Sequence, residues 1–212
     1  GHLARVNVTV GAPVVRGQAV GRMGYTGSGI NRERAHLHFE MGFLVNRRFA
    51  EWFEKYGKES SRDRNDHGLW NGNNIEGVDP VPLFKASAEG KPLTIRQIFV
   101  REKALFMVRV PANRDFFDWQ KRFPFQVEGG VVGPMPASWD ITCNAIGMPL
   151  QFKRSSVRVS EPEVIWFDFN RPVGKSFSRG LVRRSGKQAS LTERGKKWFS
   201  LLVYEGRLAN SR

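Results

Sequence analysis

The sequence has a single cysteine, Cys143, among its 212 residues. One cysteine excludes an internal disulfide and any cysteine-rich metal site. The residues around Cys143 supply no base that could activate a thiol, so we expect a buried, inert side chain. Long apolar runs are also lacking, because no stretch approaches the about 18 apolar residues that span a bilayer. The first residues have neither a signal-peptide nor a transit-peptide pattern.

Acidic residues are in the minority, and most strongly so after residue 90. Residues 1–90 carry 12 Lys and Arg against 10 Asp and Glu, a net charge of +2. Residues 91–212 carry 22 against 10, a net charge of +12. This difference predicts two units with unlike surfaces. A basic surface favours polyanions, among them nucleic acid, anionic lipid and acidic cell-wall polymers.

Residues 171–212 are especially basic, with 11 Lys and Arg and two acidic residues. Basic residues mixed with aromatic ones can bind single-stranded nucleic acid. However, Trp198, Phe199 and Tyr204 have helical spacing, which predicts that they belong to a core. Nucleic acid is therefore not the expected partner, and the basic residues are expected to form a solvated face.

Short strands and tight turns are expected in residues 3–25, where apolar residues alternate with polar or small ones between glycines. A glycine-rich loop at 24–35 is followed by an alternation that predicts a strand over 35–41. Aromatic residues at helical spacing predict an amphipathic helix in residues 46–60. Residues 61–77 are polar and rich in glycine and asparagine, as loops are.

The sequence KASAEGKP at 85–92 is the best candidate for a linker. Beyond it the pattern predicts strands at 93–100, 104–110 and 151–169 and a short helix at 113–123. A terminal helix is expected within 190–204, with Ser190 or Thr192 as its N-cap.

The sharpest chemical feature is the run His36-Leu37-His38-Phe39-Glu40. Positions i and i+2 of a strand share a face, so His36 and His38 should project together while Leu37 and Phe39 enter the core. Two imidazoles held close together on a rigid element suit a metal site or an acid–base site. An isolated H-x-H is more often a pair of surface histidines, so the neighbouring sequence decides.

That neighbouring sequence resembles the lysostaphin/LytM-type zinc endopeptidases, which cut peptide cross-links in bacterial cell walls. The family pattern runs H-x-x-x-D, Y-x-H-L, glycine-rich hairpins and H-L-H-F-E. Gly1-His2-Leu3 matches the second element, Gly11 to Gly29 the third and His36 to Glu40 the fourth. Residues 78–83 resemble the segment that often ends the domain. The resemblance covers residues 1–84.

The fold expected from this resemblance and from the patterns is mainly β. An antiparallel LytM-type peptidase domain, a duplicated hybrid motif with a barrel-sandwich-like sheet, would occupy residues 1–84 with a helical insertion at 46–76. The linker at 85–92 would lead to a basic α+β domain of unknown role at 93–212. The resemblance also implies a location in the cell envelope, either periplasmic or extracellular.

The family roles imply a zinc site. His38 corresponds to a zinc ligand, and His36 to a catalytic base or hydrogen-bond partner. His2 corresponds to the histidine that lines the site and helps to hold the water and the developing oxyanion. Glu40 points to the same side of the expected strand, where it could orient a histidine. A purely structural carboxylate at Glu40 is an equal alternative.

The sequence departs from the family pattern at several points. It contains no H-x-x-x-D, so two zinc ligands are expected upstream of Gly1, and the chain is expected to be a fragment. One zinc ion is therefore expected only in the full-length protein, because catalytic zinc needs about three protein ligands. Asp66 and His67, in the insertion, are expected to be solvated rather than replacement ligands. The insertion could instead form one wall of a substrate groove.

Two functions remain open at this point. The first is a zinc metalloendopeptidase acting on peptidoglycan peptides. The second is a degenerate LytM-type domain that binds the cell wall or a partner without cutting. In either case the basic C-terminal region could bind anionic wall polymers. A biotinyl or lipoyl carrier domain is excluded, because residues 1–50 contain no lysine to accept the cofactor.

Overall fold

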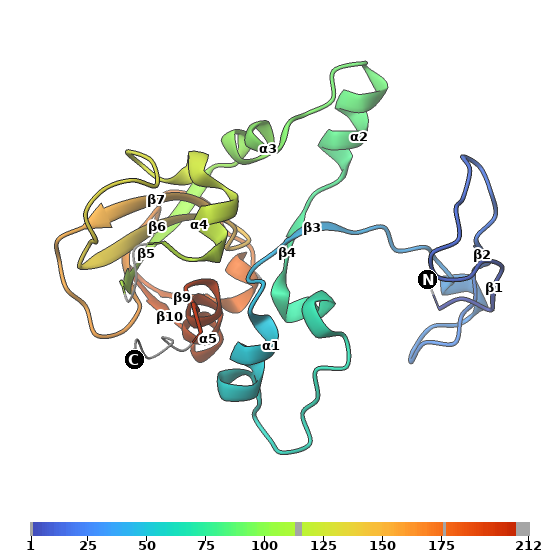
Figure 1. The fold of residues 1–212 in the computed structure, drawn as a ribbon, viewed down its shortest axis with the longest axis horizontal. Helices are drawn as coiled ribbons and strands as arrows, with labels where there is room; N and C mark the ends of the chain where they lie inside the picture. Colours follow the sequence, from blue (N-terminus) through green and yellow to red (C-terminus); the bar gives the residue numbers. More distant parts are fainter. Residues whose placement is uncertain (1, 113–115, 176, 207–212) are drawn as a thin grey trace, which may run out of the picture. The chain divides into compact units, whose positions relative to one another are not determined.

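The computed structural model describes residues 2–112, 116–175 and 177–206. The chain forms two compact units, residues 1–41 and residues 42–212 (Figure 1). Helices take up 27% of the chain and strands 24%, so the fold is mixed rather than mainly β as the sequence suggested. The strands that do form are antiparallel and belong to small sheets.

The first unit has little regular structure. Strands β1 (Arg5–Val6) and β2 (Gly21–Arg22) pair antiparallel, with Val6 opposite Gly21. The expected strand over 35–41 is not formed in residues 35–40, and strand β3 (Met41–Leu44) begins only at its end. An isolated extended segment gains no ladder hydrogen bonds, which is why periodicity alone does not make it a strand.

The second unit is built around a four-stranded antiparallel sheet in the order β7-β6-β5-β8. Its strands are β5 (Ala104–Pro111), β6 (Ser138–Asn144), β7 (Pro149–Ser155) and β8 (Glu163–Phe167). Two smaller pairs accompany it, β3 with β4 (Ile75–Val78) and β9 (Val182–Ser185) with β10 (Gln188–Leu191). The helices are α1 (Phe49–Trp52), α2 (Val81–Ala88), α3 (Ile95–Arg101), α4 (Asp118–Arg122) and α5 (Glu193–Leu202).

Helix α3 corrects the expected strand at 93–100. Thr94 accepts a hydrogen bond from the backbone N–H of Gln97, and the Gln97 side chain accepts one from the backbone N–H of Thr94. This reciprocal capping box satisfies two amide groups that would otherwise lack partners at the start of a helix. The helix then buries Phe99. A local capping arrangement therefore outweighs the strand propensity of this segment.

The helices expected within 46–60 and 190–204 are confirmed. Helix α1 continues into a π-helical turn, Phe53–Gly57, and Thr192 caps α5 by accepting from the backbone N–H of Gly195. The helix expected at 113–123 appears as α4, although residues 113–115 lie outside the described residues. Trp198 and Phe199 are buried as predicted.

Residues 45–53 belong to the same hydrophobic core as the four-stranded sheet and α5. The buried Asn46 donates hydrogen bonds from Nδ2 to the carbonyl oxygens of Leu201, at 2.8 Å, and Tyr204, at 2.7 Å. Trp52 Nε1 donates to Ser200 Oγ at 3.0 Å. The helical insertion is thus integrated with the C-terminal helix, even though about 150 residues of sequence separate them.

A charged network also joins these parts. Asp118, at the start of α4, accepts hydrogen bonds from Arg47 Nε at 2.7 Å and from Arg122 Nε at 2.8 Å. Arg122 in turn donates to the carbonyl oxygens of Leu44 and Val45. Burial alone would raise the pKa of Asp118, but the hydrogen bonds from Arg47 and the charge of Arg122 hold it below its usual value.

Cys143 lies in β6 with its side chain buried and unpaired, as expected. Burial, reinforced by the nearby Glu76, raises the pKa of this thiol well above its usual value. A thiol that stays protonated is a poor nucleophile, so the interpretation of Cys143 as an inert core residue is confirmed. Among the described helices none is both long and apolar enough to cross a membrane.

Candidate functional site

The two histidines of the H-x-H motif do face each other. Nε2 of His36 lies 2.7 Å from Nε2 of His38, and the ring centroids are 4.6 Å apart. The pair is exposed to solvent. The prediction that these imidazoles project together is therefore confirmed, although residues 35–40 do not form the strand from which it was made.

The hydrogen bonds around the pair define where its protons lie. His36 Nδ1 is 2.6 Å from the carbonyl oxygen of Arg34, which can only accept, so this nitrogen carries a proton. In the neutral ring Nε2 of His36 is then the acceptor, and Nε2 of His38 must donate to it. Nδ1 of His38 lies 3.5 Å from the carboxylate of Glu40. Hydrogen bonds therefore link Arg34, His36 and His38 in order, whereas Glu40 is an ion-pair partner only of a protonated His38.

Arg34 is held in place by a short 3₁₀ turn, Arg32–Arg34. The Asn31 side chain accepts a hydrogen bond from the backbone N–H of Arg34 at 3.0 Å, and Arg34 Nη1 donates to the carbonyl oxygen of Gly29 at 2.7 Å. The glycine-rich loop before the motif therefore positions the carbonyl that orients His36. Residues that are close in sequence thus determine the orientation of the His36 ring.

His2 packs against the glycine-rich loop of the first unit. Its backbone has a φ of 41°, and its ring packs so closely on Gly27 that a Cβ there would meet it at 2.6 Å. In the described part of the chain, no three His, Cys, Asp or Glu side chains are grouped so that they could hold a metal ion. His2 therefore does not complete a metal-binding group with His36 and His38 here.

Two expectations about the neighbouring apolar residues are wrong. Leu37 is 73% exposed and Phe39 is 57% exposed, whereas both were expected in a core. The physical reason is that a two-stranded pair as short as β1 and β2 offers no apolar layer to cover them.

Asp66 and His67, in the insertion, are exposed to solvent as expected, and Asp66 pairs with Arg64 at 3.3 Å.

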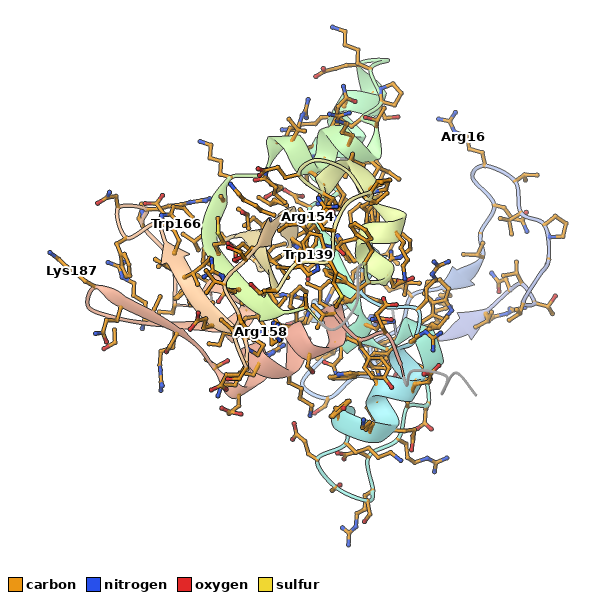
Figure 2. All side chains as sticks on the ribbon, turned by 60° about the vertical axis from the view of Figure 1, so that its left-hand side comes forward. Arg16, Trp139, Arg154, Arg158, Trp166 and Lys187 are labelled. Carbon is orange, nitrogen blue, oxygen red and sulfur yellow. The ribbon has the colours of Figure 1, made fainter. Side chains whose placement is uncertain are left out.

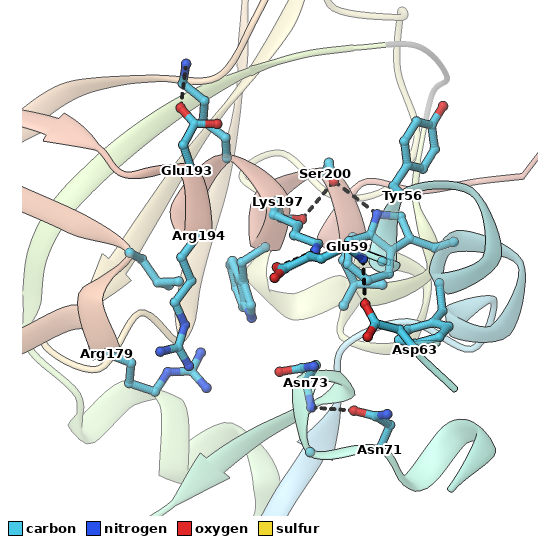
Figure 3. Close-up of a pocket in the computed structure, with 18 of the residues that line it drawn as sticks. Tyr56, Glu59, Asp63, Asn71, Asn73, Arg179, Glu193, Arg194, Lys197 and Ser200 are labelled. Atoms are coloured by element: carbon cyan, nitrogen blue, oxygen red, sulfur yellow. Dashed lines mark hydrogen bonds and ion pairs between the residues drawn. The ribbon is translucent and has the colours of Figure 1, made fainter. Parts of the chain in front are cut away.

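The second unit contains a cleft of about 990 Å³, shown in Figure 3. One wall comes from the insertion, with the aromatic side chains of Trp52, Phe53 and Tyr56, and the other comes from α5 and the turn that contains Arg179. The insertion thus forms one wall of this cleft, and its expected role beside a substrate groove stays a prediction. Trp70, whose side chain is exposed, is not among the residues that line it.

Arg179 connects this cleft to a buried carboxylate. Its guanidinium forms an ion pair with Glu76 in β4, whose side chain is completely buried. Burial raises the pKa of Glu76 to about 7, although the charge of Arg179 opposes that rise. Arg179 Nε also donates to the carbonyl oxygen of Ile146 at 2.9 Å. These contacts fix the direction of the guanidinium.

Comparison with known protein families, with curated proteins and with solved structures finds no match to this chain. The functional argument therefore depends on the residues themselves. The motif order identifies the histidine pair from sequence. No comparable signal marks the cleft, because its residues are scattered between positions 52 and 201 and are brought together only by folding.

Proposed function

We propose that this chain is part of a LytM-type zinc metalloendopeptidase that hydrolyses peptide cross-links of bacterial peptidoglycan. The observation that supports this most strongly is the close pair of His36 and His38 with Glu40 behind it. Residues of the same three types, in the same order, form the H-L-H-F-E element that the sequence resembles. Under this proposal residues 1–84 belong to an antiparallel LytM-type domain in the complete protein, which resides in the cell envelope.

The residues present fit zinc in donor type but not in number. Imidazole nitrogens and carboxylate oxygens are ordinary zinc ligands, yet the described residues supply no group of three. Two nitrogens that bind one tetrahedral zinc at about 2.0–2.1 Å lie about 3.3 Å apart, further than the 2.7 Å between the two Nε2 atoms. This spacing favours one ligand and one base over two ligands.

In the proposed roles, Nε2 of His38 loses the proton that it donates to His36 in this structure. His38 would present Nε2 to the metal while Glu40, near its Nδ1, orients the ring. His36, held by the carbonyl oxygen of Arg34, would keep Nε2 free to accept the proton of the attacking water. Zinc, when bound, lowers the pKa of its water to about 7 and polarises the amide carbonyl. His2 would hydrogen-bond the developing oxyanion.

The proposal predicts that His38→Ala weakens Zn²⁺ or Co²⁺ binding by the native polypeptide that contains the upstream ligands at least about 10-fold, because a direct ligand is lost. His67→Ala is the matched control, since His67 is exposed in the insertion and should leave affinity unchanged. Titration followed by the absorbance of Co²⁺ measures both. Equal affinities for wild type and His38→Ala would contradict the assigned ligand.

The activity itself is tested with purified peptidoglycan and the native polypeptide in which these residues occur. Release of soluble peptides that stops on chelation and returns with zinc supports the peptidase. Sedimentation with peptidoglycan without release supports the second candidate, a degenerate domain that binds without cutting. If the polypeptide neither releases peptides nor sediments with peptidoglycan, both candidate functions are ruled out.

We further propose that the basic C-terminal part binds anionic wall polymers. The β9–β10 hairpin supports this, because Arg183, Arg184 and Lys187 are exposed on it and Lys187 projects from its tip (Figure 2). Arg183→Gln combined with Lys187→Gln is expected to weaken binding to a purified anionic wall polymer several-fold at low salt and less at high salt. An unchanged affinity at low salt would exclude the hairpin as the contact.

A further inference from the structure

The cleft of the second unit is not used by the proposed peptidase chemistry, which depends on residues of the first unit. At about 990 Å³ it is at the upper end of the about 300–1,000 Å³ typical of ligand sites. Its lining combines aromatic, amide and charged side chains, a composition suited to a polar organic ligand rather than to a bare ion.

One end of the cleft is cationic. Figure 3 shows the guanidinium groups of Arg179 and Arg194 close together there. Arg179 is held by Glu76 and by the carbonyl oxygen of Ile146. Arg194 is exposed and, among the residues that the structure describes, has no acidic partner. Glu76 pairs with Arg179 alone, so Arg194 keeps a positive charge that can bind a further carboxylate in a bidentate manner.

The backbone that presents Arg179 is strained. Ser178 and Arg179 have φ values of 51° and 52°, in a region that residues other than glycine rarely adopt. Buried hydrogen bonds from Ser178 N–H to Ala145 and from Val182 N–H to Ser178 Oγ hold this turn. Strained turns of this kind concentrate at functional sites, where the surrounding structure imposes them.

The opposite end of the cleft carries a carboxylate, Asp63, that forms no ion pair among the described residues. Asp63 accepts hydrogen bonds from the backbone N–H groups of Glu59, at 2.7 Å, and Ser60, at 2.9 Å, and these lower its pKa. Glu59 is paired with Lys197 at 3.0 Å. Figure 3 shows Asp63 on the far side of Asn73 from Arg179, so this carboxylate and that guanidinium lie at opposite ends of the cleft.

We propose that this cleft binds a short zwitterionic peptide, with its carboxylate on Arg179 and Arg194 and its ammonium group towards Asp63. The aromatic side chains of the insertion would pack against the peptide between its ends, and Asn73 could hydrogen-bond its backbone. This proposal stands independently of the peptidase proposal.

The test is calorimetric titration of the 212-residue chain with tetraalanine, a peptide with both termini free. Tetraalanine amide should bind at least about 10-fold more weakly, and N-acetyl-tetraalanine several-fold more weakly. Arg194→Gln should weaken tetraalanine binding at least about 10-fold. Arg101→Gln, the same change at an exposed position of α3 outside the cleft, should leave it unaltered.

Other results would overturn the proposal. An absence of binding at millimolar tetraalanine would do so, as would an equal effect of Arg194→Gln and Arg101→Gln. Equal affinity for tetraalanine and its amide would exclude a carboxylate site. Inorganic phosphate that binds as tightly as tetraalanine, and loses affinity in Arg194→Gln, would show a general anion site instead. Because Arg194 is exposed, its substitution should not disturb folding.

Discussion

Asp118→Ala is expected to lower the free energy of unfolding by about 3 kcal/mol, the lower end of the range for breaking a buried ion pair. Asp118 is almost fully buried and accepts hydrogen bonds from Arg47 and Arg122. Arg122 is mostly buried. Without the Asp118 carboxylate, its guanidinium would stay charged but have little access to water. Arg47 is largely exposed and can be solvated, which is why we expect the lower end.

Urea denaturation at pH 7 measures this loss. Asp66→Ala is the matched control, because Asp66 pairs with Arg64 at the surface and such pairs contribute about 0–1 kcal/mol. A loss below about 1 kcal/mol for Asp118→Ala would show that the buried network adds no stability. The result also bears on domain organisation, since the network joins the segment after β3 to α4.

The domain boundaries predicted from the sequence do not follow the packing seen in the structure. Composition places a linker at 85–92, yet residues 81–88 are helical and residues 45–53 share a core with α5. Charge counts and glycine content describe each segment by itself and cannot predict contacts between distant segments. Asn46, for example, donates hydrogen bonds to carbonyl groups at the end of α5. The linker remains a prediction, and limited proteolysis at 85–92 would show whether the two sides separate.

Individual elements were predictable where one face of a segment is buried. Strand β5 alternates, and α5 has apolar residues at helical spacing together with a capping threonine. Strand β6 was not predicted, because almost all of its seven residues are buried and no alternation results. Helix α3 was misassigned because a single capping pair outweighs the β-branched residues that follow.

The candidate site divides in the same way. The facing of His36 and His38 was predictable because it depends on neighbours two positions apart in the sequence. The burial of Leu37 and Phe39 depends on distant segments, and that prediction was wrong. The cleft lay beyond sequence reasoning for the same reason: Glu76, Arg179 and Arg194 carry no shared motif, and only the tertiary fold places them together.

Glu76→Gln is expected to remove a pH dependence of stability of about 3 kcal/mol. Burial raises the pKa of Glu76 to about 7 from its ordinary 4.5, and each pKa unit corresponds to about 1.36 kcal/mol. Below pH 4.5 the carboxyl is protonated in both the folded and the unfolded chain. Between pH 4.5 and about 7 the unfolded chain releases its proton first, so stability falls as pH rises through this window.

The measurement is the free energy of unfolding of wild type, Glu76→Gln and Glu89→Gln at pH 5 and pH 8. Glu89 is exposed at the end of α2, so its variant should keep the wild-type difference. In Glu76→Gln that difference should shrink by about 2–3 kcal/mol, because glutamine has no proton to release and pH 5 already lies inside the window. An unchanged difference would mean that Glu76 stays ionised below pH 5 and that Arg179 fully compensates its burial. Either result defines the charge next to Arg179, and with it how strongly that guanidinium can attract a carboxylate in the cleft.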